Sequence, residues 1–178
     1  MKKAFVLPAL LMVTFLCLPA NPIPQTVSQL GFVVKTAIPA VETIAIVFNQ
    51  SNQAQVEGEA KAATLVTKKK ILIYGVTTKA DIAKHISSIS GLGGNVVAVV
   101  YSDNAVLNAD SVKFITQKLG VKKIPVVSTR AADTLEGALL GIVKTPDKLE
   151  KHLNKKVMPI FGITLAPEFL ADCIVDIE

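Results

Sequence analysis

Aromatic side chains are scarce in this sequence: none of its 178 residues is tryptophan and only two are tyrosine. Proteins that bind single-stranded nucleic acid stack bases on aromatic side chains set among basic ones. The only dense basic run, Lys68 to Lys70, stands where a helix is expected to end, and cations are favoured there by the helix dipole. We therefore interpret the run as a solvated helix end and predict no nucleic-acid partner.

The sequence also lacks the motifs of common catalytic centres. It has no Gly-x-Ser-x-Gly elbow, no cysteine-histidine arrangement, no histidine-rich metal spacing and no dinucleotide-binding glycine fingerprint. The glycine cluster at Gly91 to Gly94 precedes an expected strand and lacks the ending of a phosphate loop, so we interpret it as a turn. We predict no enzymatic activity, no cofactor and no metal ion. An unrecognised carboxylate pair is the alternative, and replacing Asp103 would test it.

Cysteine is rare as well, and one of the two cysteines, Cys17, falls in an N-terminal export signal. Residues 1–20 combine a basic start with an apolar stretch and a small residue, Ala20, after which we expect cleavage. The stretch is short for a membrane span, which needs about 20 residues, although an uncleaved anchor is the alternative. Bulky Leu16 disfavours lipidation of Cys17. The sequence predicts a periplasmic or otherwise exported protein.

Cleavage would leave Cys173 as the only cysteine, so no internal disulfide could form and stability must come from packing. Apolar neighbours at Leu170, Ile174 and Val175 favour a buried thiol, with an intermolecular bridge as the alternative.

About 158 residues follow the predicted signal, which is enough for one domain and too few for two ordinary ones. Residues 21–40 are expected to lead the chain to the sheet. Pro22 and Pro24 predict an extended start, and residues 29–37 fit either a helix or a short strand. Residues 41–178 then form a single α/β lobe.

Apolar runs alternating with helical patterns predict an open, mainly parallel sheet with helices on both faces, as in flavodoxin-like folds. Capping residues support two of the helices: Thr78 with Asp81, and Asn108 or Asp110. Thr145 and Pro146 fit the start of a further short helix. The expected strands are 44–48, 71–75, 96–101, 123–128, 138–143 and 158–165, and the other expected helices are 53–68 and a closing turn at 167–173.

Polar segments follow three of these strands. Asn49 to Asn52 follows the first strand, Tyr101 to Asn104 the third, and Ser128 with Thr129 the fourth. In open α/β sheets, ligands bind outside the carboxyl ends of the strands. These segments are therefore candidates for a binding site, although the same residue types also serve turns and helix caps.

Residues from about 25 to 178 resemble the C-terminal lobe of the periplasmic substrate-binding proteins of ABC transporters, which have the two-lobed type I periplasmic-binding-protein fold. The order and spacing of several short segments carry the resemblance: Ile44 to Asn52 with its following helix, Tyr101 to Asn104, Lys123 to Ser128, Glu136 to Leu139, and Phe161 to Leu165.

The resemblance implies binding of a small polar organic solute, such as an amino acid, by the loops after the first, third and fourth strands. Asp103 could meet an ammonium group, and the other residues would form neutral hydrogen bonds. The matching positions in this sequence are Asn49, Ser51, Asn52, Ser102, Asp103, Asn104, Ser128 and Thr129.

This chain departs from the family in having no room for the first lobe, which in the family closes on the ligand by hinge motion. An open half-cleft would hold a small solute weakly. Besides an inner-membrane permease, its partner could therefore be a membrane-anchored sensor protein or a second copy of the chain. A periplasmic regulatory module that holds such a sensor inactive is the alternative function.

Overall fold

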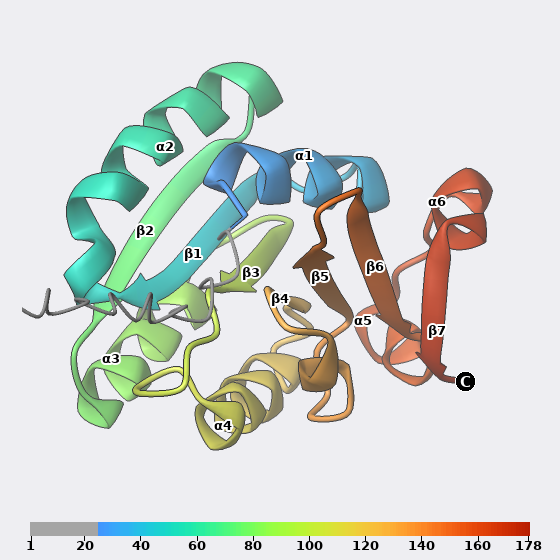
Figure 1. Ribbon diagram of the computed structural model, residues 1–178. Helices are drawn as coiled ribbons and strands as arrows, with labels where there is room; N and C mark the ends of the chain where they lie inside the picture. Colours follow the sequence, from blue (N-terminus) through green and yellow to red (C-terminus); the bar gives the residue numbers. More distant parts are fainter. Residues whose placement is uncertain (1–24) are drawn as a thin grey trace, which may run out of the picture.

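The computed structural model describes residues 25–178, which form a seven-stranded sheet in the order β2-β1-β3-β4-β5-β6-β7 (Figure 1). Strands β1 to β5 are parallel, β6 is antiparallel to β5, and β7 is parallel to β6. This confirms the mainly parallel α/β sheet that the sequence predicts. The predicted signal peptide and the extended start of the leader lie outside the described residues.

The strands and helices have the following bounds. The strands are β1 (Thr43–Asn49), β2 (Lys70–Val76), β3 (Val96–Val100), β4 (Val126–Ser128), β5 (Leu140–Lys144), β6 (Leu149–Asn154) and β7 (Cys173–Ile177). The α-helices are α1 (Val27–Ala37), α2 (Gln53–Thr67), α3 (Lys79–Ser90), α4 (Ala109–Gly120), α5 (Met158–Phe161) and α6 (Pro167–Ala171). Three 3-10 helices join them: η1 (Gln50–Asn52), η2 (Ala131–Thr134) and η3 (Lys155–Val157).

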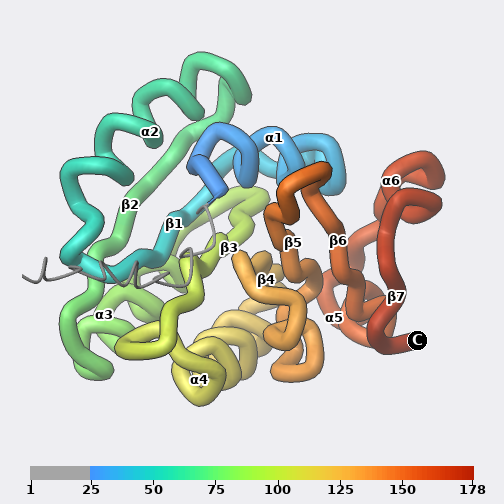
Figure 2. Tube along the Cα trace, viewed as in Figure 1, coloured from blue at the N-terminus to red at the C-terminus, as the bar shows by residue number. Residues whose placement is uncertain are grey.

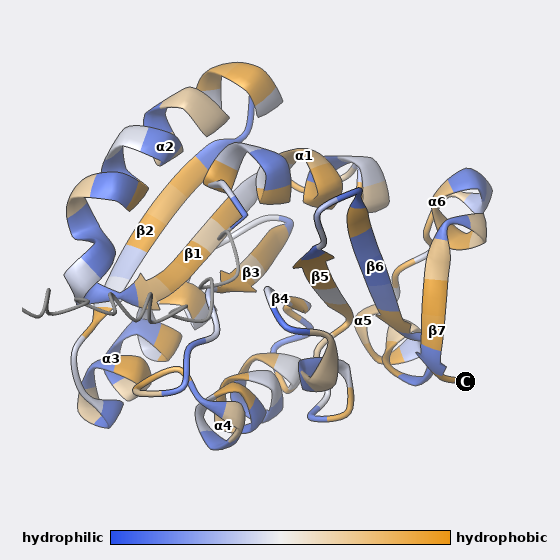
Figure 3. Cartoon of the chain, viewed as in Figure 1, coloured by the Kyte–Doolittle hydropathy of each residue, from blue (hydrophilic) through white to orange (hydrophobic). Residues whose placement is uncertain are grey.

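Strand β1 is buried on both faces, which explains its unbroken apolar sequence. Ile44, Ile46 and Phe48 point into the core that α1 and α2 cover. Ala45 and Val47 point into the second core, under α3 and α4. The hydropathy colouring of Figure 3 shows β1 and β3 as predominantly hydrophobic strands at the centre of the molecule.

Three of the helices that pack on this sheet, α2, α3 and α4, begin where the sequence predicts. Thr78 and Asp81 form a capping box at the start of α3, and Asn108 caps α4 by accepting a hydrogen bond from the Ser111 amide. The predicted inner faces are all buried: Val56, Ala60 and Ala63 of α2, Ile82, Ile86 and Ile89 of α3, and Val112, Ile115 and Leu119 of α4.

The segment that the sequence left open between helix and strand is helix α1. Thr26 caps it in a capping box with Gln29, and Glu59 of α2 accepts a hydrogen bond from the Val27 amide at 2.8 Å. Gln25, just before the helix, is fixed at the carboxyl ends of the strands: its side chain donates to the Ile142 carbonyl at 2.6 Å, and its own carbonyl accepts from the Tyr101 hydroxyl at 2.8 Å.

Two predictions for the C-terminal part are wrong. Thr145 and Pro146 do not start a helix: the Thr145 amide donates to the Lys148 carbonyl, which closes a turn between antiparallel β5 and β6. Residues 158–165 do not form a strand, because Pro159 sits in the first turn of α5 and Gly162 ends that helix in the left-handed conformation. The last two strands are instead β6 and β7.

The expected closing helix is present as α6, and β7 follows it. Cys173 lies on β7, where its thiol is partly buried and donates to the Phe169 carbonyl, and burial raises the pKa of this thiol. Its neighbour Ile174 is 45% exposed, so the predicted apolar surroundings of the cysteine are only partly present. Among residues 25–178, no helix is both long and apolar enough to cross a membrane.

Candidate functional site

The sheet changes its winding direction between β1 and β3, because the chain passes from β1 outward to β2 and then returns to place β3 on the other side of β1 (Figure 2). Ligands bind open α/β sheets at such a point, outside the carboxyl ends of the strands. A hollow of about 680 Å³ opens there, which we call the carboxyl-edge hollow. Its lining includes Asn49, Asn52, Asp103, Thr129 and Arg130.

Asn49 and Asp103 join the two strands that flank this point. The Asn49 side-chain amide donates to Asp103 Oδ2 at 3.0 Å. The other carboxylate oxygen, Oδ1, accepts from the amides of Ala105 and Leu107, each at 2.8 Å. Asp103 therefore shapes the loop after β3, and Oδ2 keeps capacity for one further donor.

A buried carboxylate, Asp133, organises the next part of the hollow. It is 1% exposed, and its Oδ2 accepts hydrogen bonds from the hydroxyls of Ser102 and Ser128. Its Oδ1 accepts from Arg130 Nε at 2.9 Å and Nη2 at 2.6 Å. This buried charge is thus paired and fully hydrogen-bonded, as buried charges must be.

Arg130 links this network to the hollow. Its side chain is 31% exposed and belongs to the lining. A guanidinium carries five N–H donors in a fixed planar arrangement, and Asp133 uses only part of them. The Thr129 hydroxyl accepts from the Ser102 amide at 3.0 Å, which ties the loop after β4 to the loop after β3.

The structure brings most of the predicted site residues together. Asn49, Asn52, Ser102, Asp103, Asn104 and Thr129 line the carboxyl-edge hollow. Ser128 is fully buried behind it, on Asp133. Ser51 does not line it: its hydroxyl donates to Asn49 Oδ1 at 2.9 Å and so supports the turn after β1.

Sequence reasoning missed two central residues, Arg130 and Asp133. One signal was available for the first, because Arg130 is the only arginine in the sequence and directly follows Thr129. Asp133 lies three residues further on, within reach of the arginine in a helical turn. Gln25 also lines the hollow, and no sequence pattern indicated this role.

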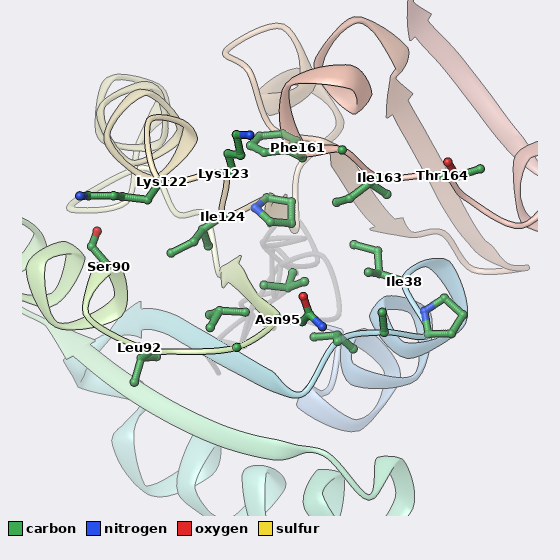
Figure 4. Close-up of a pocket in the computed structure, with 18 residues that line it drawn as sticks. Ile38, Ser90, Leu92, Asn95, Lys122, Lys123, Ile124, Phe161, Ile163 and Thr164 are labelled. Carbon is green, nitrogen blue, oxygen red and sulfur yellow. The ribbon is translucent and has the colours of Figure 1, made fainter.

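A second hollow, of about 340 Å³, lies at the opposite edge of the sheet, near the amino ends of the strands. Figure 4 shows Ile38, Ile124 and Ile163 around it, with Asn95 reaching toward its centre. Its cations are Lys122 and Lys123, and neither forms an ion pair within residues 25–178. The polar network that could recognise a charged solute is therefore at the carboxyl edge. No cluster of metal-ligating side chains occurs within residues 25–178.

Comparisons with known proteins match the structure but not the sequence. No family model and no curated protein matches the chain. A conserved domain protein from Vibrio cholerae O1 biovar El Tor is similar in structure, with a TM-score of 0.73 at 17% identity over 87% of this chain and 61% of that one.

Two further structures are similar over nearly the same extent. A ligand-free, open substrate-binding protein with adhesive properties from Clostridium difficile has a TM-score of 0.68 at 20% identity, over 86% of this chain and 60% of that one. An ABC domain from Streptococcus pneumoniae in complex with L-Trp has a TM-score of 0.67 at 17% identity, over 82% and 58%.

These likenesses establish the fold. The chain has a periplasmic-binding-protein-like α/β architecture, as the sequence resemblance implied. It spans about three fifths of the length of the structures it matches.

Proposed function

We propose that this chain is an exported solute-binding protein that holds a small polar organic solute in the carboxyl-edge hollow. The observation that carries the proposal is the fixed guanidinium of Arg130, which Asp133 holds through two of its nitrogens while the side chain faces the hollow. A side chain that is already oriented loses little conformational freedom when a ligand binds.

The chemistry of Arg130 favours a solute with a carboxylate. Guanidinium groups bind carboxylates through parallel charge-assisted hydrogen bonds, which are stronger than hydrogen bonds between neutral groups. Lys144 adds a second positive charge to the lining. An anionic group is therefore the part of the solute that this side of the hollow recognises.

The segments after β1 and β3 suit an amine or another hydrogen-bond donor. Asp103 Oδ2 keeps a lone pair after accepting from Asn49, and the side-chain amides of Asn52 and Asn104 make no hydrogen bond within residues 25–178. Carboxylate recognition by Arg130 and amine recognition by Asp103 together fit an amino acid. The L-Trp complex of the similar streptococcal structure supports testing amino acids first.

A thermal-shift screen of the purified protein against amino acids, nucleosides and small organic acids tests the proposal. A ligand stabilises by RT ln(1 + [L]/Kd), about 2.7 kcal/mol at one hundred times Kd. For a domain of this size that corresponds to a rise of about 5–11 °C in Tm. We expect a saturable rise with solutes that carry a carboxylate and none with their amides.

Variants at the hollow locate the binding. Arg130→Lys keeps the charge but loses the planar fork, so we expect a smaller ligand-induced rise above the variant's own Tm. Lys84→Gln, at an exposed position outside the lining, is the matched control and should respond like the original protein.

Two results would contradict the proposal. One is a ligand response that is the same in Arg130→Lys and the original protein. The other is the lack of any rise at millimolar solute, which would move the search to a protein partner at the same hollow, such as a membrane-anchored sensor.

A further inference from the structure

Strand β2 is an edge of the sheet whose outer side pairs with no strand among residues 25–178 (Figure 1). It is seven residues long, pairs with β1 without a bulge and contains no proline. Natural edge strands are usually shortened, bent or interrupted, because an open edge is a template for pairing with another chain. This edge has few of those features.

The direction of the backbone groups along β2 follows from two hydrogen bonds. The Lys70 amide donates to the Glu42 carbonyl, just before β1, so Lys70, Leu72 and Tyr74 direct their backbone groups toward β1. The alternate residues Ile71, Ile73 and Gly75 must then direct theirs outward. The His85 ring nitrogen lies 3.1 Å from the Gly75 carbonyl and so occupies that outward acceptor. Within residues 25–178, the outward amides and carbonyls of Ile71 and Ile73 have no hydrogen-bond partner.

The side chains of this edge are mainly apolar. Ile71 and Ile73 pack partly on the core under α1 and α2, and Tyr74 packs partly on the other core. Leu72 is partly exposed and packs on neither core. A leucine at the middle of an open edge is the residue that gains most from a facing strand.

We propose that a second copy of this chain pairs with β2 in antiparallel register about a twofold axis at Leu72. Ile71 of each copy would face Ile73 of the other, and each facing pair exchanges two hydrogen bonds, about four in all. All the free outward groups of Ile71 and Ile73 are then used, while His85 keeps the Gly75 carbonyl. The two Leu72 side chains meet at the axis, where facing residues approach most closely.

Charge favours this antiparallel arrangement. The basic run from Lys68 to Lys70 stands at the amino end of β2. Glu57, Asp81 and Lys79 stand near its carboxyl end, where Gln53 approaches Gly75, so these three residues give that end one net negative charge. Antiparallel pairing places the basic end of one copy beside the acidic end of the other, twice by symmetry. Parallel pairing would set the two lysine runs together. A closed twofold contact also limits the assembly to a dimer.

Sedimentation velocity of the purified protein, from about 5 to about 500 µM, tests for a reversible dimer. Leu72→Lys places two cations at the axis, and we expect the dissociation constant to rise about tenfold or more. Leu65→Lys is the matched control, since Leu65 is 80% exposed on α2 and absent from the proposed contact. It should leave the dimer unchanged, and both variants should keep the original Tm within a few degrees.

A cross-link tests the register. Leu72→Cys, in a background without other cysteines, should oxidise to a covalent dimer, because the facing Cα atoms of such a pair lie within disulfide reach. Leu65→Cys should stay monomeric on the same gel. A monomer at every concentration would overturn the proposal and identify Lys70 and His85 as protection of the edge. A dimer that Leu72→Lys does not weaken, or equal cross-linking at both positions, would overturn the proposed surface.

Discussion

The substitution Asp133→Asn removes one buried negative charge while keeping the volume of the side chain. Asp133 accepts from the hydroxyls of Ser102 and Ser128 on one oxygen and from Arg130 on the other. An asparagine can keep its oxygen toward Arg130 and turn its amide toward the two hydroxyls, which can rotate to accept. The main loss is therefore the charge of the pair and not a set of hydrogen bonds.

The structure sets the size of this loss. Hydrogen bonds to charged groups are worth about 1.5–3 kcal/mol each, and removing one partner of a fully buried ion pair costs about 3–5 kcal/mol. The Asp133 side chain is 1% exposed but Arg130 is 31% exposed, so water screens part of the interaction. We expect the free energy of unfolding to fall by about 2–3 kcal/mol, which lowers Tm by about 4–12 °C in a domain of this size.

Urea unfolding followed by circular dichroism measures this change. Asp147→Asn, the same substitution in the exposed turn before β6, is the control and should change stability by less than about 0.5 kcal/mol. If Asp133→Asn cost no more than Asp147→Asn, the Arg130–Asp133 pair would not stabilise the fold. The guanidinium would then lack the fixed orientation on which the proposed function depends.

Two further predictions concern the backbone near the hollow and the cap of α3. Gly141→Ala should lower the free energy of unfolding by about 1–3 kcal/mol, because the new Cβ would lie 2.7 Å from the Arg130 carbonyl oxygen and 2.8 Å from Ala131 Cα. Gly93→Ala is the control in the same urea experiment and should be nearly neutral, because no atom lies within 4 Å of its new Cβ. The amides of Thr77 and Thr78 lower the pKa of Asp81, so its contribution to stability is present above the ordinary carboxyl pKa and is lost as pH falls through the lowered value. Asp81→Asn should therefore reduce the fall in the free energy of unfolding as pH is lowered. If this fall were the same in Asp81→Asn and in the original protein, the prediction would be contradicted.

The sheet from β1 to β5 could be predicted because its strands read as apolar runs: β1, β3 and β4 are buried on both faces, and β2 and β5 are also mainly apolar. The helices between them carry strong local signals, such as the capping box of Thr78 and Asp81 and the isoleucines at helical spacing in α3. Local preference and tertiary packing agree in this half of the chain, and such agreement makes a sequence readable.

The C-terminal part could not be predicted for the opposite reason. Strand β6 has the sequence Leu-Glu-Lys-His-Leu-Asn and is largely hydrophilic in Figure 3, so no apolar run marks it. It is a strand because it pairs with β5 through the turn at Thr145, and this pairing is a tertiary interaction that the local sequence of β6 does not indicate. The apolar segment from Met158 to Leu165 is not a strand, because its apolar side chains Met158, Phe161, Ile163 and Leu165 pack against the core from a short helix and a loop.

The polar segments of the candidate site were predictable in position but not in chemistry. Parallel strands bring their carboxyl ends to one edge, so Asn49, Asp103 and Thr129 had to gather there. Which polar groups remain free depends on hydrogen bonds between segments distant in the sequence, such as Asn49 to Asp103. A sequence gives the donors and acceptors, and only the fold shows which of them are already used.

The residues at the hollow are of two kinds: some have side chains already hydrogen-bonded within the chain, and others keep side-chain groups available to a ligand. Ser128 and Asp133 are buried and satisfied within the chain, so replacing them should lower stability and should affect ligand binding only through Arg130. Asn104 is exposed and has no side-chain hydrogen bond within the described residues, so replacing it should leave stability unchanged and reduce only a ligand response. Arg130 belongs to both kinds, because the donors that hold it to Asp133 and the donors that face the hollow are in one rigid plane. If the hollow binds a carboxylate, replacing Arg130 should lower both the free energy of unfolding and the affinity for that ligand.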